Sequence, residues 1–337
     1  MQTMYEELIE QIFASSTLQE RPPVLLDIGA SGAIHAQWSS FAKHSIAIAF
    51  DADDREMGYI EKTDGGFRKL YVINRIVTER KQGRMPFVLT KSPYCSSLLE
   101  PDLDSLRHWS FVDYFLPERR TELETTDLPT VLRDLGLDRV DWFKTDSQGT
   151  DLRLFRSLGD ALCRSVAVAE FEPGIIDAYR GEDKLYAVLA HMDGLPFWVS
   201  RLTVRGAERI NPEIARSVFS PHELRHLRYG DSVLLTSPGW AEITYTNTFE
   251  WLGHADKRAA LLGVTFALVQ RQLGFALDLA LRAKNLFADP VFAAAAEYCV
   301  VEIRGQIRER HEQTAARAGS SLKQRVKRAL IRRLERL

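Results

Sequence analysis

Acidic residues and glycines follow several short apolar runs of this sequence, and they are the side chains best suited to chemistry. Ligands of open α/β sheets bind outside the carboxyl ends of the strands, so strand ends that lie side by side share one crevice. The runs at 24–26, 45–50, 139–146 and 165–171 are typical of buried strands. At or just after their ends stand Asp27, Gly29, Ala30, Ser31 and Gly32; Asp51 and Asp53; Lys144 and Asp146; and Glu170 and Glu172.

Asp27 stands directly before the glycine-containing turn at 29–32. Gly29 and Gly32 lack a Cβ atom, so the backbone can approach a ligand closely there. A diphosphate seeks backbone amides and a helix N-terminus, and an acid at this point would repel it. S-adenosylmethionine instead carries a cationic amino group and a sulfonium, which an aspartate attracts. The turn therefore favours S-adenosylmethionine as the ligand, and a capping role for Asp27 is the alternative.

Asp51 closes the second apolar run, about 20 residues after the glycine turn. An acid at this spacing can accept hydrogen bonds from both hydroxyl groups of a ribose. The same spacing is found in domains that bind NAD, so it indicates a ribose and not the identity of the cofactor. Asp53 competes with Asp51 for this role, and a solvated turn is its alternative interpretation.

Lys144 and Asp146 are the predicted catalytic residues. Side chains alternate along a strand, so these two should point to the same side of the sheet. Asp146 could accept the proton of an acceptor hydroxyl, and Lys144 could set its charge or contact the acceptor oxygen. The alternative is a structural ion pair at the end of the sheet.

Glu170 and Glu172 share a face at a neighbouring strand end and suggest a metal site. Together with Asp146 they could provide oxygen ligands for Mg²⁺, which would lower the pKa of the acceptor. Solvated strand-end acids are the alternative. His35, just after the glycine turn, is a further candidate base, although a lone histidine is more often a cap or a surface residue.

Strands that alternate with helices predict an α/β, Rossmann-like fold: a mostly parallel sheet with helices on both faces. The runs at 197–204 and 232–236 should add strands at one edge. Alanine- and leucine-rich segments with helical spacing follow residue 251. We expect an N-terminal helix in 1–21, a Rossmann-like domain in 22–245, a helical extension in 246–310 and a basic amphipathic tail in 311–337.

Composition limits the classes of function. The chain has 337 residues, of which 45% are hydrophobic and 27% charged, with a formal net charge of −2. Such a balance gives no global field for nucleic acid. The three cysteines lack the spacing of metal ligands. Neither a secretory signal nor a transmembrane run is evident, so we expect a cytoplasmic protein.

The tail combines apolar residues at helical spacing with many lysines and arginines. The apolar positions are Leu322, Val326, Leu330, Leu334 and Leu337. A helix of this kind can lie on an anionic membrane surface, so peripheral membrane contact through 322–337 is one interpretation. A solvated helix, or one that forms a homo-oligomer, is the other.

The segment 140–152, with sequence VDWFKTDSQGTDL, resembles the signature of the FkbM family of methyltransferases. An apolar strand ends there in Lys-x-Asp and is followed by a turn with glycine, an acid and a leucine. Leu26–Ala30 and Ile48–Asp51 resemble the first motif and the second strand end of that family. Ser96–Leu98 and Thr126–Leu128 resemble its serine pair and its Thr-Leu-Asp segment. The resemblance extends over residues 22–200.

The resemblance implies methyl transfer from S-adenosylmethionine to oxygen, often a hydroxyl of a sugar or a polyketide. It also implies that Ser97 and Asp127 belong to the cofactor site, although hairpin capping would explain Ser97. The sequence departs from the family pattern at Ser31, Ala33, Asp51, Gln148 and Asp151. Cofactor binding stays plausible with these changes, but Gln148 cannot act as a carboxylate.

Three hypotheses follow. The first is an O-methyltransferase for a carbohydrate or a related small molecule. The second is an NAD-dependent oxidoreductase, against which Asp27 and the Lys144–Gly149 segment argue. The third is a non-catalytic module that binds partners through its helical extension.

Overall fold

The computed structural model describes residues 2–29, 34–50, 66–253 and 255–334; of residues 2 and 315–334 it describes the backbone alone. Its centre is a seven-stranded sheet with the order β3-β2-β1-β7-β8-β10-β9. The strands are β1 (Val24–Ile28), β2 (Ile46–Phe50), β3 (Lys69–Ile73), β7 (Trp142–Thr145), β8 (Val168–Phe171), β9 (Phe197–Glu208) and β10 (Thr236–Asn247).

The sheet is mostly parallel, as predicted. Strands β3, β2, β1, β7 and β8 pair in parallel, whereas β10 pairs antiparallel with both β8 and β9. Every residue of β1 is buried, which agrees with an apolar strand covered on both faces. One predicted edge strand is wrong in its bounds, because only residue 236 of the run 232–236 lies in β10.

A second, three-stranded sheet with the order β4-β6-β5 is inserted between β3 and the next helix of the main fold. It consists of β4 (Ile76–Val77), β5 (Arg84–Thr90) and β6 (Pro117–Thr126). Strand β5 contains the apolar residues Phe87, Val88 and Leu89, which are buried. Between β5 and β6 lie η4 (Pro93–Cys95), α3 (Leu103–Leu106) and η5 (Val112–Phe115), which supply walls of the site described below.

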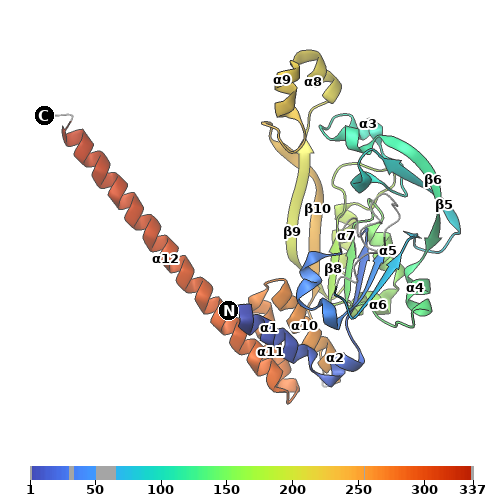
Figure 1. Ribbon diagram of the computed structural model, residues 1–337, viewed down its shortest axis with the longest axis vertical. Helices are drawn as coiled ribbons and strands as arrows, with labels where there is room; N and C mark the ends of the chain where they lie inside the picture. The colour runs from blue at the N-terminus through green and yellow to red at the C-terminus, as the bar shows by residue number, and fades with distance from the viewer. Residues whose placement is uncertain (1, 30–33, 51–65, 254, 335–337) are drawn as a thin grey trace.

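Helices cover both faces of the main sheet (Figure 1). One face carries α4 (Leu128–Asp134), α5 (Asp151–Ser157), α6 (Asp160–Ser165) and α7 (Leu185–Met192), whose apolar side chains pack on residues such as Phe143 and Phe171. The other face carries α1 (Gln2–Phe13), α2 (Ser16–Glu20), η1 (Ala36–Ser40), η2 (Ala42–His44), α10 (Lys257–Val269), α11 (Leu273–Leu286) and the start of α12 (Pro290–Leu334).

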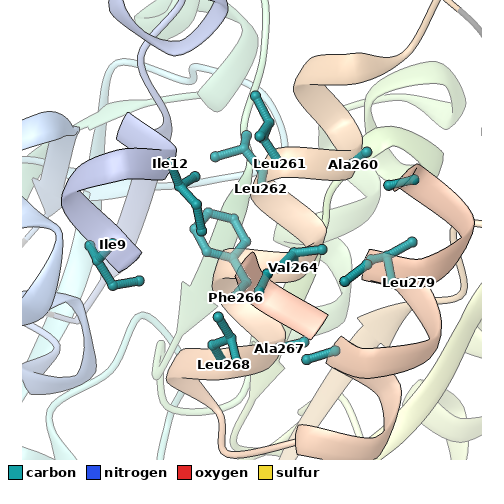
Figure 2. Packing of buried hydrophobic residues seen from close by; sticks show 14 of the residues in the cluster. Ile9, Ile12, Ala260, Leu261, Leu262, Val264, Phe266, Ala267, Leu268 and Leu279 are labelled. Atoms are coloured by element: carbon teal, nitrogen blue, oxygen red, sulfur yellow. The ribbon is translucent and has the colours of Figure 1, made fainter. Parts of the chain in front are cut away.

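The N-terminal helix and the helical extension share one hydrophobic core with the sheet. Ile9 and Ile12 of α1 lie beside Leu262 and Phe266 of α10 in Figure 2. Arg258 of α10 also makes two hydrogen bonds, of 2.8 and 2.7 Å, to the buried carboxylate of Asp141 before β7. The expected boundaries at 21 and 246 therefore separate elements of a single packed unit.

Two elements project from this unit in Figure 1. The first is the long hairpin of β9 and β10, which carries α8 (Pro212–Val218), α9 (Pro221–Leu224) and η6 (Arg225–Leu227) at its tip. The second is α12, which continues beyond the expected boundary at 310 to Leu334. The apolar stripe predicted for 322–337 falls where the side chains lie outside the described residues. Within the described part of the chain, no helix is long and apolar enough to cross a membrane.

Candidate functional site

The strand order reverses between β1 and β7, and the two loops that follow these strands are bonded to each other. The chain passes from β1 to β2 and β3 on one side, and from β7 to β8 on the other. The amide of Asp146 donates a hydrogen bond of 2.9 Å to the carbonyl of Ile28. In sheets of this architecture, such a reversal opens the crevice that binds ligands.

Gly29 is required by this close approach. Its φ is +78°, a conformation that side chains disfavour. A Cβ atom at this position would lie 2.2 Å from the carbonyl oxygen of Asp146. The amide of Gly29 also donates to the carbonyl of Phe50 at 3.0 Å, so the ends of β1, β2 and β7 are held together. The sequence predicts that a ligand approaches the backbone at Gly29, whereas the group that lies against Gly29 here is the carbonyl of Asp146.

Asp27 and Lys144 form a buried ion pair. The Lys144 Nζ lies 2.9 Å from Asp27 Oδ1, and the amide of His35 donates to Asp27 Oδ2 at 3.0 Å. Burial disfavours the charged ammonium, but the charges of Asp27 and Asp146 outweigh it and raise the pKa of Lys144. Lys144 therefore forms a structural ion pair at the end of the sheet, but its partner is Asp27 and not Asp146. Asp27 lines neither of the cavities described below.

The loop after β7 is held by the buried Asp151, at the start of α5. Its Oδ1 accepts hydrogen bonds from Thr145 Oγ1 at 2.9 Å, from the Ser147 amide at 2.9 Å and from Ser147 Oγ at 2.6 Å. These bonds fix the turn that carries Asp146 and Gln148. Asp151, shorter than the glutamate of the resembling motif, therefore serves the shape of the loop.

Gln148 joins the loop to the rest of the site. Its φ of +56° is uncommon for a residue with a side chain. Ser97 Oγ donates to its backbone carbonyl at 2.7 Å, and Tyr179 Oη donates to its side-chain oxygen at 2.9 Å. The amide Nε2 of Gln148 in turn donates to Asp146. The chain Tyr179–Gln148–Asp146 thus orients the carboxylate that the sequence indicates as the base.

Two cavities meet at this loop. A cavity of about 520 Å³ lies between the loop and the inserted segment, and its walls include Asp146, Gln148 and Glu172. A smaller cavity of about 80 Å³ is lined by Ile28, Gly29 and Phe50 at the ends of β1 and β2. Asp146, Gln148 and Tyr94 line both. A group bound in one cavity therefore lies next to a group bound in the other, at Asp146.

The acids of the larger cavity hold their protons more tightly than free carboxyls. Burial, assisted by the charge of Asp151, outweighs Lys144 and Gln148 and raises the pKa of Asp146 to about 6. Burial and the charge of Asp146 raise the pKa of Glu172 to about 9. Asp146 is therefore ionised at neutral pH, whereas Glu172 of the free protein is protonated.

The predicted magnesium triad of Asp146, Glu170 and Glu172 is not assembled. Glu170 Oε1 accepts a hydrogen bond from Trp142 Nε1 and lies 3.2 Å from His35 Nε2. Glu170 is therefore engaged by Trp142 and His35 and not by a metal site. His35, the further candidate base, is likewise engaged by Glu170. Among the described residues, no group of three or more histidines, cysteines and acids could hold a metal ion.

Asp127 has a structural role instead of the predicted place in the cofactor site. It caps α4 by accepting from the Thr130 amide at 2.7 Å and from the Lys81 amide at 2.8 Å. Although burial raises the pKa of Asp127, the hydrogen bonds from Thr130 and Lys81 lower it overall. Both carboxylate oxygens of Asp127 are used, and it lines neither cavity.

Ser97 supports the Gln148 loop, while its neighbour Ser96 lines the smaller cavity. Four predicted site positions in the glycine turn and beyond, namely Ala30, Ser31, Gly32 and Asp51, lie outside the described residues, as does Asp53. The structure therefore brings together Gly29, Lys144, Asp146 and Glu172 from the predicted set.

Sequence reasoning missed Tyr179 and the aromatic walls of the larger cavity. Tyr179 is buried and bonded to Gln148 and to the carbonyl of Cys95. Phe111, Tyr229 and Trp240 come from segments far apart in the chain, so no local pattern could group them. Gln148 itself stood in the quoted motif, but only its missing charge was considered.

No protein-family model and no curated protein matches the chain.

Proposed function

We propose that this protein is an S-adenosylmethionine-dependent O-methyltransferase that acts on a hydroxyl of a carbohydrate or a related small molecule. The observation that carries the proposal is the meeting of two cavities at Asp146, at the point where the strand order reverses. One cavity suits the methyl donor and the other an acceptor, with a carboxylate between them. The resemblance of residues 140–152 to the FkbM signature supports the same reaction.

The residues of the smaller cavity suit the donor. Ile28 and Phe50 offer apolar surface, and Asp146 offers negative charge. A sulfonium is attracted by such a carboxylate, whereas a diphosphate is repelled. The described walls enclose about 80 Å³, room for part of the donor only. Residues 30–33 and 51–65, next in the chain to Gly29 and Phe50, lie outside the described residues.

The negative charge that disfavours a dinucleotide comes from Asp146 and not from Asp27. Asp27 is paired with Lys144 at 2.9 Å, so its charge is compensated and no longer excludes a diphosphate. Asp146 lines the smaller cavity, so its negative charge would repel a diphosphate that is bound there. NADH is therefore a necessary control ligand in any binding test.

In the proposed reaction, Asp146 is the general base. The donor supplies a methyl carbon that its sulfonium already activates. With a pKa raised to about 6, Asp146 is deprotonated at neutral pH but more basic than a free aspartate, so it can accept the hydroxyl proton as the new C–O bond forms. Gln148 and Tyr179 are positioning residues, because they hold the Asp146 carboxylate through hydrogen bonds.

Lys144 is also a positioning residue in this account. Its ammonium is shared between Asp27 at 2.9 Å and the carbonyl of Gly29 at 3.5 Å. It thereby ties the β1 loop to β7 and keeps positive charge close to Asp146. By holding the two loops together, Lys144 helps to align the donor and the acceptor, and this alignment lowers the barrier to methyl transfer.

The experiment is transfer of a labelled methyl group to a panel of glycans and small hydroxylated molecules. We expect Asp146→Asn to lower kcat/KM by about 100-fold or more, since removal of a general base typically costs that much. Binding of S-adenosylmethionine should survive in this variant. Asp127→Asn, which alters a carboxylate outside both cavities, is the matched control. An unchanged rate in Asp146→Asn would remove that residue from the mechanism.

A further inference from the structure

The larger cavity has an unusual wall for an acceptor site. Its described lining contains seven aromatic side chains and three carboxyl groups, and none of its described lining residues is a lysine or an arginine. The aromatic side chains are Tyr94, Phe111, Tyr114, Phe115, Tyr179, Tyr229 and Trp240. Such a wall offers aromatic surface and carboxyl groups, but none of its described residues is a cationic partner for a phosphate or a carboxylate of a ligand.

Two of the three carboxyl groups already have partners inside the protein. Glu182 Oε1 lies 3.0 Å from Lys184 Nζ and accepts from the Ala178 amide at 2.7 Å. Asp146 accepts from the Gln148 side chain. Their charges are therefore at least partly compensated without a ligand.

Glu172 differs, because no hydrogen bond or ion pair to another described residue is found for its carboxyl. The charged groups that influence it are Asp146, Asp151, Lys144, Glu242 and Arg205. Both cations among them are engaged elsewhere: Lys144 lies 2.9 Å from Asp27, and Arg205 lies 2.8 Å from Glu242. Glu172 thus faces the cavity as a largely buried acid without a counter-ion of its own.

We propose that the larger cavity selects an acceptor that carries a positively charged amino group, held by Glu172 and the surrounding aromatic rings. Ammonium groups are attracted to the faces of tyrosine, tryptophan and phenylalanine rings, and more strongly so when water is excluded. Glu172 releases its proton to solvent when the ammonium group binds, and the resulting carboxylate completes the recognition. The idea that this ligand is also the methyl acceptor rests on the proposed function, whereas the preference of the cavity for a cation does not.

The amino group serves recognition and not reaction. A protonated amine has no lone pair to attack a methyl carbon, so the accepting atom remains a hydroxyl oxygen next to Asp146. The same wall disfavours phosphorylated acceptors, because the ionised Asp146 would repel them and no cation in the described lining would bind them.

Tyramine and tyrosol provide a matched pair of probes, because they differ only in an ammonium in place of a hydroxyl. We expect the wild-type protein to bind tyramine about tenfold more tightly, because the Glu172 carboxylate favours the ammonium over the hydroxyl. Glu172→Gln should lose this preference while keeping its affinity for tyrosol. Glu10→Gln, which removes a surface carboxylate paired with Lys43 outside the cavity, should keep the preference and is the control.

The wild-type protein alone can overturn the inference, if it binds the two probes with equal affinity or does not bind tyramine. A preference that persists in Glu172→Gln would do so as well. Calorimetry with S-adenosylmethionine on the same samples separates the two proposals. If the protein binds the donor but does not prefer tyramine, this inference alone is wrong. If it prefers tyramine but does not bind the donor, only the methyltransferase proposal is wrong.

Discussion

At the scale of single residues, the site depends on burial and neighbouring charges, which give two carboxyl groups different pKa values. Asp146 lies near the Lys144 ammonium and accepts from Gln148, which keeps its pKa near 6 despite its burial. Glu172 lacks such partners, and its pKa rises to about 9. One acid is therefore available as a base at neutral pH, and the other stays protonated until a cation binds.

The pH dependence of methyl transfer follows from the state of Asp146. A general base must be deprotonated, so kcat/KM should rise as the pH passes through about 6 and level off above pH 7. A pH profile of labelled methyl transfer measures this directly. Lys144→Met should move the midpoint to higher pH, because the ammonium favours the ionised form of Asp146. A profile that is flat between pH 5 and 7 would contradict the role of Asp146.

Glu172 predicts how stability changes with pH. Its carboxyl keeps its proton in the folded protein up to about pH 9, whereas the unfolded chain releases it near the ordinary value of 4.5. The folded state therefore binds more protons in this window, and Glu172 makes the wild type less stable as pH rises from 5 to 8.

Glu172→Gln removes that slope. The free energy of unfolding of the variant minus that of the wild type should grow by at least about 1 kcal/mol between pH 5 and pH 8, since one unit of pKa shift is worth about that much. Urea denaturation at the two pH values measures the difference, with Glu10→Gln as the control. A difference that is constant or shrinks would show that Glu172 is not held protonated.

At the scale of elements, the site exists because the ends of β1, β2 and β7 are bonded to one another. Gly29 donates to Phe50, and Asp146 donates to Ile28. The turn after β7 is then fixed by Asp151 and by Ser97, which comes from the inserted segment. Each loop is thus shaped by contacts from a different part of the fold.

Gly29→Ala tests this junction. The added Cβ would lie 2.2 Å from the Asp146 carbonyl oxygen, so the two loops must separate. We expect loss of S-adenosylmethionine binding and destabilisation by several kcal/mol, well beyond the roughly 1–2 kcal/mol for the left-handed conformation alone. Gly83→Ala is the matched control, because Gly83 has a similar φ of +82° and no atom near its added Cβ. Equal effects of the two substitutions, measured by calorimetry and urea denaturation, would contradict the proposed junction.

Much of this local organisation could be predicted from the sequence. The apolar runs of β1, β2, β7 and β8 and the acids at their ends indicated the sheet and the position of Asp146. The partners of those acids could not be predicted, because they depend on the register between strands. In the sheet, Asp27 lies next to Lys144 on the neighbouring strand, and Lys144 lies next to Glu170. Glu170 consequently lies beside Trp142 and His35, a contact that periodicity along one strand does not show.

At the scale of the whole molecule, segments from both ends of the chain stabilise the sheet. The cluster under one face joins α1, α10, α11 and the start of α12 to Trp38, Phe41 and Trp142. Helical spacing in the sequence predicted these helices. That they share a core with the sheet could not be predicted, because helical periodicity gives the apolar face but not its partner.

This shared core predicts the result of truncation. Removal of 246–337 exposes the apolar face of the sheet and deletes buried residues such as Phe266, whose loss alone typically costs about 3–5 kcal/mol. We expect that variant to lack a cooperative thermal transition by circular dichroism. Removal of 315–337 touches none of the described clusters and should leave the transition in place. A cooperative transition in the chain that lacks 246–337 would contradict this expectation and would indicate that the part before residue 246 folds without the helical extension.

We propose that the crevice between β1 and β7 binds a cationic methyl donor. Isothermal titration of the full chain with S-adenosylmethionine, S-adenosylhomocysteine and NADH tests it most directly. The account predicts saturable binding of the first two at one site per chain, lost in Gly29→Ala and absent for NADH. Binding of NADH alone, or no binding of either adenosyl ligand, would contradict it.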